Sequence, residues 1–597
     1  MSTAILTGPP APGSSLDGDL RLLGFDVKAA SGAEEAGALL AAVPAGERVA
    51  LVDPRFVGHL HALRLALTDP RFPAAAAPGA LTAQSGARPA LTRALGAASA
   101  TAGDGDDLTG TVADALDADG VAVHRPQLGT LVATVPTDAE ARHEARAAVA
   151  AVDDEAVRLR SAVKAHDGFF TTFFISPYSR YIARWCARRG LTPNQVTTAS
   201  LLTALVAAAC AATGERGGYI AAGVLLLVSF VLDCTDGQLA RYALKYSTMG
   251  AWLDATFDRA KEYAFYAGLA LGAARNGDDV WALALGAMIL MTCRHVVDFS
   301  FNEANHDATA NTSPTAALSD RLDSLGWTVW ARRMIILPIG ERWAMIAVLT
   351  AFTNPRIVFW ALIIGCAFGA CYTTAGRVLR SLTRKAKRTD RAAQALADLA
   401  DSGPLAGMFA RIGRRGPRSA FTAPILAAIA AAMVLVNSYV IGPGASNVAA
   451  AVGYACFAGF AVAAPLKGPL DWLLPPLFRA AEYGTILLLA AKSDAPHALP
   501  AAFGLVAAVA YHHYDTVYRI RGGTGAPPAW LVRVTGGHEG RTLLVTVLAA
   551  LLADRGDDFT LALTALAVAV ALVVLVESIR FWVSSGAPAV HDEGETA

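Results

Sequence analysis

The sequence predicts a mainly α-helical, polytopic membrane protein with a soluble α/β domain at its N-terminus. Hydrophobic residues make up 54% of the chain of 597 residues, and charged residues make up only 17%. From residue 191 onward, apolar runs close to the length of membrane helices follow one another, and polar turns separate them. Before residue 155, short apolar segments alternate with Ala-rich stretches, which is the pattern of strands and helices in an α/β layer.

Charge and cysteine content indicate which partners, metal sites and compartments are expected for this protein. The formal net charge is +0 at pH 7, and we expect no nucleic-acid partner. The 7 cysteines contain no Cys-x-x-Cys pair, so the sequence indicates neither a disulfide framework nor a zinc site, in keeping with a reducing compartment. The N-terminus has no basic segment followed by an apolar one, so we predict no signal peptide.

Residues 1–155 are expected to form the soluble α/β domain. Helices separate its predicted strands, which lie at residues 4–6, 49–52, 121–123 and 130–135. Residues 75–107 are rich in Ala, Gly, Pro and Ser, and we interpret them as a loose loop.

Residues 156–190 are predicted to be a linker that ends in a short amphipathic helix. In this helix Tyr181, Ile182 and Trp185 lie opposite several arginines. A helix of this kind lies in the membrane interface, with its basic face toward anionic lipid headgroups.

Residues 191–380 are expected to form a first membrane domain of six helices. Its apolar runs occupy residues 196–212, 220–232, 251–274, 280–297, 335–352 and 357–375. Arginines and lysines gather in the turns on one side of these runs, and the turns on the other side carry few of them. Because basic loops stay in the cytosol, we predict that this side of the domain faces the cytosol.

A second membrane domain is predicted at residues 419–582, after a polar, basic linker at 381–418 and before a tail at 583–597. Six further apolar runs lie at residues 420–441, 448–465, 477–491, 499–510, 543–552 and 559–576. An even number of crossings in each domain leaves both ends of the chain in the cytosol.

The second membrane domain also carries ionisable residues within or next to its apolar runs. Arg479 and Glu482 lie in one run, and His512, His513 and Asp515 follow another. Ionisable residues inside a membrane are functional candidates by default. Two interpretations stay open: metal or proton chemistry, and hydrogen bonding between helices or contact with lipid headgroups. Adjacent histidines point to different helix faces, so they supply one ligand pair at most.

The residues that best define a function lie between positions 233 and 258. Asp233 and Asp236 are three residues apart and share a helix face, and Asp254 and Asp258, four residues apart, do the same. A charge inside a membrane helix costs about 2.5–3.5 kcal/mol on insertion scales, so these carboxylates need a compensating partner. Oxygen ligands without His or Cys suit Mg²⁺ or Mn²⁺. Two such cations in a cleft of acids fit phosphoryl transfer, in which they clamp phosphate oxygens. The alternative is a network of acids and an arginine that only joins helices.

This stretch resembles the signature of the CDP-alcohol phosphotransferase family, D-x-x-D-G-x-x-A-R-(x)8-G-x-x-x-D-x-x-x-D. Every fixed position of the signature is matched, by Asp233, Asp236, Gly237, Ala240, Arg241, Gly250, Asp254 and Asp258. The resemblance implies a six-helix core that transfers a phospho-alcohol group from a CDP-alcohol to an acceptor hydroxyl and releases CMP. It implies that Asp233, Asp236 and Asp254 are metal ligands. Asp258 would be the general base, and it is also a candidate metal ligand.

The resemblance also implies a nucleotide site. The pocket for the CDP moiety would be shaped by Gly237, Ala240, Arg241 and Gly250, with the planar fork of the arginine pairing with phosphate. Asn194 belongs to a Thr-Pro-Asn segment that the family commonly carries beside this pocket. Residues 164–169 read Lys-x-x-Asp-Gly-Phe and are most similar to the branch of the family that uses inositol phosphate.

The position of residues 1–155 is similar to that of a nucleotidyltransferase that precedes the phosphotransferase in bifunctional enzymes. Such a domain opens on a Gly-rich G-x-G-T-R loop, whereas the first strand here runs into Thr7, Gly8 and Pro9. We therefore expect a degenerate or unrelated α/β module without catalysis.

A phosphorylated acceptor needs basic side chains around it. Arg294, Arg332 and Arg333 lie near the predicted cytosolic end of the first membrane domain, and we predict that they contact the acceptor. Interfacial anchoring, or an ion pair that joins helices, is the alternative for them.

Together these features predict a Mg²⁺- or Mn²⁺-dependent transferase of phospholipid synthesis in the cell (inner) membrane. Its expected partners are a CDP-alcohol lipid donor, a polyol or polyol-phosphate acceptor and membrane lipids. Family members commonly form dimers, so the resemblance also implies a homodimer. The rival interpretations are a transporter or flippase whose acids bind ions, and a non-catalytic lipid-binding scaffold.

Overall fold

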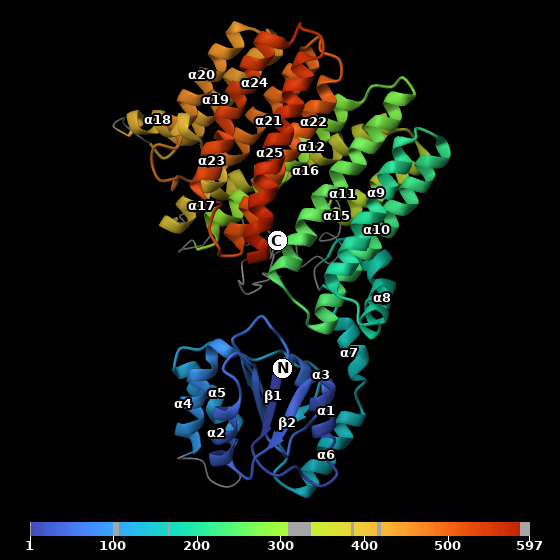
Figure 1. Ribbon diagram of the computed structural model, residues 1–597, viewed down its shortest axis with the longest axis vertical. Coiled ribbons are helices and arrows are strands. Elements are labelled where there is room, and N and C mark those ends of the chain that lie inside the picture. The colour runs from blue at the N-terminus through green and yellow to red at the C-terminus, as the bar shows by residue number, and fades with distance from the viewer. Residues whose placement is uncertain are drawn as a thin grey trace.

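The structure, a computed structural model, describes residues 2–99, 107–164, 167–307, 336–383, 387–414 and 419–584. It has a small α/β part and a large helical part, joined by a helical connection at one side (Figure 1). Seven helices among the described residues are long and apolar enough to cross a membrane. These features confirm the predicted fold class, a helical polytopic membrane protein with an N-terminal α/β domain. The domain boundaries stay predictions.

The N-terminal domain is built on a 6-stranded sheet with the strand order β2-β1-β3-β6-β5-β7. In that order the strands are Phe25–Ala29, Ser2–Leu6, Val49–Val52, Ala80–Ala83, Ala74–Ala77 and Val123–His124. β1 is parallel to β2 and β3, whereas β6 is antiparallel to β3 and β5. Two further short strands, β4 (Val57–Gly58) and β8 (Ala133–Thr134), form a separate antiparallel pair.

Helices cover both faces of this sheet (Figure 1). α1 (Leu16–Leu22) and α3 (Leu60–Leu67) bury their leucines against one face. The other face is covered by α2 (Ala33–Ala42), α4 (Arg88–Ser99) and α5 (Leu108–Ala118).

The prediction of a loose loop at residues 75–107 was wrong for the part that the structure describes. β5 and β6 form a hairpin there, and Gly79 supplies the positive φ of +77° at its turn. α4 follows directly after the 3-10 turn Ser85–Ala87. The Ala-rich composition has a packing reason, because Ala74, Ala75 and Ala80 are buried under the covering helices.

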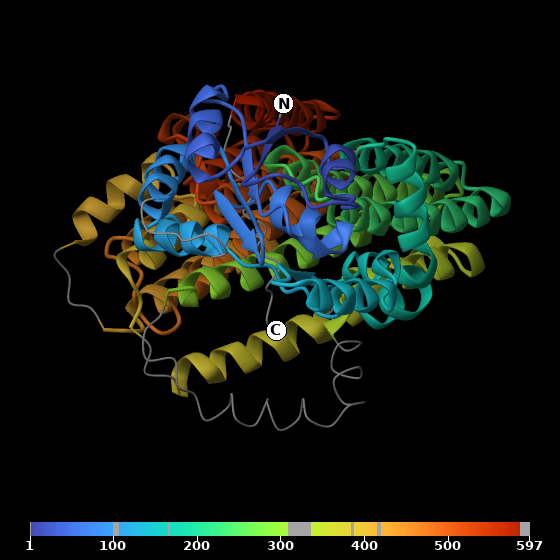
Figure 2. The ribbon, with the colours of Figure 1, turned by 90° about the horizontal axis from the view of Figure 1, so that it is seen from below.

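α6 (Ala139–Ala150), α7 (Asp154–Ser161) and α8 (Ser176–Arg188) connect the two parts of the chain. The predicted amphipathic helix is observed as α8, and its Tyr181 and Trp185 are exposed. Seen from below, the N-terminal domain lies in front of the helical part (Figure 2). Arg71 of that domain lies over the ring of Tyr246, 4.0 Å from its centroid, so the domain touches the turn between α10 and α11.

Among the described residues, six helices coincide with the six predicted runs of the first membrane domain. They are α9 (Pro193–Ala212), α10 (Arg216–Ala243), α11 (Thr248–Arg275), α12 (Trp281–Asn305), α15 (Ile339–Phe352) and α16 (Pro355–Thr383). Four of them, α9, α10, α12 and α16, are long and apolar enough to cross a membrane. α9 packs against both α10 and α11, and α15 packs against α10. The start of α9 is fixed by a capping box, in which Thr192 accepts from the backbone N–H of Gln195 and the Gln195 side chain accepts from the backbone N–H of Thr192.

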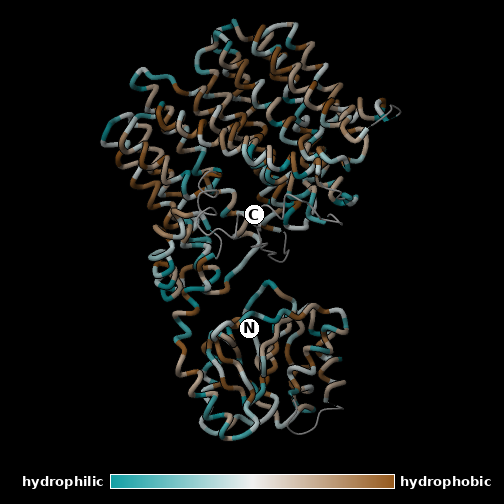
Figure 3. The backbone as a smooth tube through the Cα atoms, turned by 180° about the vertical axis from the view of Figure 1, so that it is seen from behind, coloured by the Kyte–Doolittle hydropathy of each residue, from teal (hydrophilic) through white to brown (hydrophobic). Residues whose placement is uncertain are grey.

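In residues 387–414 and 419–584, the structure describes nine further α-helices. They are α17 (Asp390–Ala400), α18 (Pro404–Gly413), α19 (Thr422–Val440), α20 (Ala445–Ala461), α21 (Leu474–Lys492), α22 (Ala498–Arg521), α23 (Ala529–Thr535), α24 (Gly537–Leu552) and α25 (Asp558–Ser584). α21 packs on α12, and α22 packs on both α11 and α12, so the two halves share one core. Hydrophobic residues run along the helices, and hydrophilic ones mark many of the turns (Figure 3).

Candidate metal centre and active site

Three of the four predicted carboxylates converge in the structure. Asp233 and Asp236 lie on α10 and Asp254 lies on α11, and one carboxylate oxygen from each lies within 4.8 Å of the other two. The connection between the helices is short. Leu244 ends α10 in the left-handed region at φ 51°, and the Ser247 side chain caps the start of α11. The chain therefore reverses at once, and the acid-bearing faces of the two helices meet.

These three residues, the carboxylate trio, have the chemistry of a site for a hard divalent cation. Oδ2 of Asp236 is buried and has no hydrogen-bond partner in the described part of the chain. Leaving a buried charged group unpaired costs more than the about 1–3 kcal/mol of a neutral one, and a bound cation removes that cost. The trio fits such a cation.

The fourth acid, Asp258, lies beside the trio and is paired with a lysine that sequence reasoning missed. Lys261 Nζ lies 2.9 Å from Oδ1 of Asp258, and it also donates to Oδ1 of Asp233. The lysine side chain is 0% exposed. Its spacing of three residues from Asp258 was the available signal, but it stands inside the predicted apolar run 251–274 and was treated as part of that run.

The predicted nucleotide residues lie on three neighbouring helices: Asn194 on α9, Gly237, Ala240 and Arg241 on α10, and Gly250 on α11. A Cβ atom at Gly250 would lie 2.8 Å from Oδ1 of Asn194 on α9 and 2.8 Å from Oγ of Ser247, so a larger residue here would displace the ends of these two side chains. The guanidinium of Arg241 passes over Gly237, 3.5 Å from where its Cβ would be, and Nε of Arg241 donates to the carbonyl of Ala162 at 2.6 Å. Ala240 lies next to Arg241 on α10.

A buried ionic network follows the acids on α11. Nη1 of Arg259 donates to Oε2 of Glu262 at 2.7 Å, and Nε of Arg342, on α15, lies 3.2 Å from Oε1 of the same glutamate. Tyr514 of α22 places its ring 5.4 Å from the Arg259 guanidinium. The residue after Asp258 is thus held by the C-terminal half of the protein, which the sequence did not predict.

The proposed acceptor arginines are only partly described. Arg294 is buried on α12 and donates to the carbonyl of Ile336. Arg332 and Arg333 lie outside the described residues. The role of all three in acceptor binding stays a prediction.

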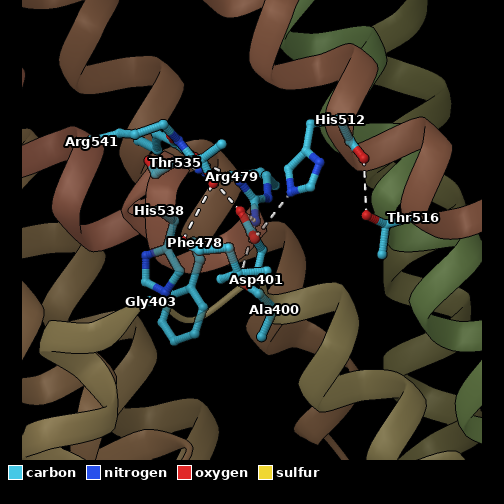
Figure 4. A network of polar contacts seen from close by, with 12 residues as sticks. Ala400, Asp401, Gly403, Phe478, Arg479, His512, Thr516, Thr535, His538 and Arg541 are labelled. Atoms are coloured by element: carbon cyan, nitrogen blue, oxygen red, sulfur yellow. Dashed lines mark hydrogen bonds and ion pairs between the residues drawn. The ribbon is translucent and has the colours of Figure 1, made fainter. Parts of the chain in front are cut away.

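The ionisable residues of the C-terminal half form a second buried network, centred on Asp401 between α17 and α18 (Figure 4). Its carboxylate lies 2.7 Å from Nη2 of Arg541, 3.1 Å from Nη2 of Arg479 and 3.3 Å from Nε2 of His512. Both arginines also bind Glu482, at 2.5 Å and 2.7 Å. The network therefore joins α21, α22 and α24 to the segment that links α17 and α18.

Asp515, one turn further along α22, also joins two helices. It accepts hydrogen bonds from Ser578 at 2.6 Å and from the Trp582 indole at 2.7 Å, both on α25, and it pairs with Arg519 at 2.8 Å. Within the described ranges, the one group of residues with metal-ligand geometry is the trio, which contains no histidine. Of the two interpretations of the ionisable residues in this half, the contacts of His512 and Asp515 agree with hydrogen bonding between helices.

The connection to the N-terminal domain also touches the end of α10. Nε of Arg158, on α7, donates to the carbonyl of Tyr242 at 2.8 Å, and the Tyr242 hydroxyl donates to Glu155 at 2.8 Å. Burial, followed by the charge of nearby Arg64, lowers the pKa of Arg158 to about 10, which leaves it charged at neutral pH. This contact lies next to Arg241, so it fixes the end of the helix that carries two acids of the trio.

The fold and the site define a class of polytopic membrane proteins in which three partly buried carboxylates form a candidate cation site near a helix turn. Residues 190–371 match the family described as CDP-alcohol phosphatidyltransferase. The chain therefore contains a CDP-alcohol phosphatidyltransferase domain, as the signature predicted. Residues 390–597 match a family of unknown function, DUF5941.

Several curated proteins are similar to part of the chain. Archaetidylinositol phosphate synthase of Pyrococcus horikoshii is 34% identical over 19% of this chain and 58% of its own length. Phosphatidylinositol phosphate synthase of Streptomyces avermitilis is 31% identical over 21% of this chain and 51% of its own. A bifunctional IPC transferase and DIPP synthase of Aquifex aeolicus is 27% identical over 34% of this chain and 45% of its own. The chain thus spans about half the length of these relatives.

Proposed function

We propose that this protein transfers a phosphatidyl-type group from a CDP-alcohol lipid to a hydroxyl group of a polyol or polyol phosphate and releases CMP. The observation that carries the proposal is the convergence of Asp233, Asp236 and Asp254 within the segment that matches the CDP-alcohol phosphatidyltransferase family. The alternative, a network of acids and basic side chains that only joins helices, agrees less well with this arrangement. In such a network each acid would pair with a basic side chain, whereas the trio places three acids next to one another.

The trio would hold Mg²⁺ or Mn²⁺, which when bound offsets the negative charge of the phosphate oxygens. Asp258 accepts the proton of the acceptor hydroxyl. The freed oxygen forms a bond to the β-phosphorus of the CDP-alcohol, the bond from that phosphorus to the bridging oxygen breaks, and CMP leaves with the electron pair. The nucleotide would be oriented by Gly237, Ala240, Arg241, Gly250 and Asn194.

The acceptor proposed first is an inositol phosphate. Two of the similar proteins are named as synthases of inositol phosphate lipids, and residues 164–169 are most similar to that branch. Gly168 of this segment packs against the Glu341 carboxylate, and the backbone N–H of Phe170 donates to the same carboxylate at 3.3 Å.

The proposed location is the cell (inner) membrane, with the active site and both ends of the chain in the cytosol. The basic turns on the side of the α10–α11 connection support this orientation. A homodimer stays part of the proposal through the family resemblance alone.

Mass spectrometry of reaction products tests the proposed function. Purified protein in detergent receives CDP-diacylglycerol, Mg²⁺ or Mn²⁺, and a panel of polyols and their phosphates. We expect CMP together with one new lipid that carries the acceptor mass, loss of both products with EDTA, and recovery when metal is added back. Donor without acceptor is the control. A transporter or a lipid-binding scaffold would give neither product with any acceptor, and that result would refute the proposed function.

A further inference from the structure

Lys261 lies beside the trio, between the carboxylates of Asp233 and Asp258. Its Nζ is shared between Asp233 and Asp258, and Oγ of Ser200 lies 3.2 Å away. The side chain is 0% exposed, and the Trp343 ring centroid is 5.6 Å from Nζ. α9, α10, α11 and α15 thus surround the lysine and leave it no path to solvent.

This arrangement separates the four signature acids into two groups. Asp236 and Asp254 have no ion pair with Lys261, and together with Asp233 they form the trio. Asp258 is outside the trio, and the lysine engages its Oδ1 at 2.9 Å. A second divalent cation bound by Asp258 and Asp233 would have to lie against the ammonium group, and in a buried site of low dielectric like charges repel strongly.

We propose that the Lys261 ammonium group is a built-in positive charge between Asp233 and Asp258, so that this site takes one divalent cation, at the trio, in place of two. The inference deepens the proposed function, because it concerns the same site, but it is a statement about metal stoichiometry. The acids alone favour two cations, so Lys261 changes the number that the sequence predicts.

The proposal explains why Asp258 is available as a base. An aspartate shared between two divalent cations offers its oxygens to metal, whereas Asp258 has the Lys261 ammonium group at its Oδ1 in the place of a second cation. Lys261 is therefore a positioning residue, which acts through Asp258 and Asp233 and not on the substrate.

The test counts Mn²⁺ ions per chain in the donor-free protein, by equilibrium dialysis with metal analysis and by electron paramagnetic resonance. D254N removes one member of the trio and gives the background of Mn²⁺ ions bound elsewhere on the protein. The count is therefore the number of ions that the wild type binds and D254N does not. We expect one such Mn²⁺ in the wild type. K261M keeps the length of the side chain without its charge and should bind two, with spin coupling, because paired metals lie about 3.5–4 Å apart in two-metal sites. K245M is the control, because Lys245 is exposed in the turn between the same helices, and it should bind one.

Two coupled Mn²⁺ ions in the wild type would overturn the proposal, and so would a single ion in a folded K261M. If K261M does not fold, the count and the coupling in the wild type decide alone. The proposed function fails separately: a protein that binds one Mn²⁺ but releases no CMP refutes the transferase, and one that binds two and releases CMP refutes only this inference.

Discussion

Replacement of Asp258 by Asn is expected to lower the rate constant for CMP release by about 10²–10⁴-fold, the range for loss of a general base. An amide cannot take the proton of the acceptor hydroxyl. The cation site should survive, because Asp258 is not a member of the trio. The measurement is kcat at saturating Mn²⁺, together with Mn²⁺ binding by the same preparation.

D254N is the matched variant, one turn earlier on α11. Because Asp254 belongs to the trio, this change should abolish both Mn²⁺ binding and turnover. The comparison separates a base from a ligand. Turnover of D258N above a tenth of the wild-type value, or equal loss of Mn²⁺ binding in both variants, would show that the roles are assigned wrongly.

Replacement of Asp401 by Asn is expected to lower the free energy of unfolding by about 3–5 kcal/mol, the cost of breaking a buried ion pair from one side. The Asp401 side chain is 6% exposed and pairs with Arg479 and Arg541. In the variant, Glu482 would be the one carboxylate of the network left to pair with both arginines. The backbone adds nothing to this cost: Asp401 has φ 54°, a left-handed conformation that Asn also adopts. The measurement is denaturant unfolding in detergent micelles.

D390N is the control for this prediction. Asp390 lies at the start of the same helix, α17, and pairs with Lys467 at 2.6 Å, but its side chain is 93% exposed. Exposed pairs contribute about 0–1 kcal/mol, so this variant should unfold almost as the wild type does. Equal destabilisation by the two changes would mean that the Asp401 network does not hold the C-terminal helices together.

The trio could be predicted from the sequence because its geometry is local. Acids at spacings of three and four residues share helix faces, and the short turn after Ala243 brings α10 and α11 together. The contact between Asn194 and Gly250 is not local, and it was anticipated only through the family resemblance.

Lys261 and the Asp401 network could not be predicted, because their partners depend on tertiary packing. A lysine in an apolar run can extend toward the interface or turn inward, and here α9 and α15 close around it. Arg541 meets Asp401 across 140 positions of sequence, and Asp401 stood in a segment interpreted as a polar linker. The hairpin of β5 and β6 was missed for a different reason: its alanines resemble a loop by composition, although burial against α3 and α5 makes small side chains suitable there.

Anomalous X-ray scattering from crystals of the wild-type protein grown with Mn²⁺ tests the central claim most directly. The expected result is a manganese peak within coordination distance of carboxylate oxygens from Asp233, Asp236 and Asp254. A protein with no peak at these residues, or with its manganese bound elsewhere while they pair with basic side chains, would contradict the assignment of this cluster as the metal centre of a transferase.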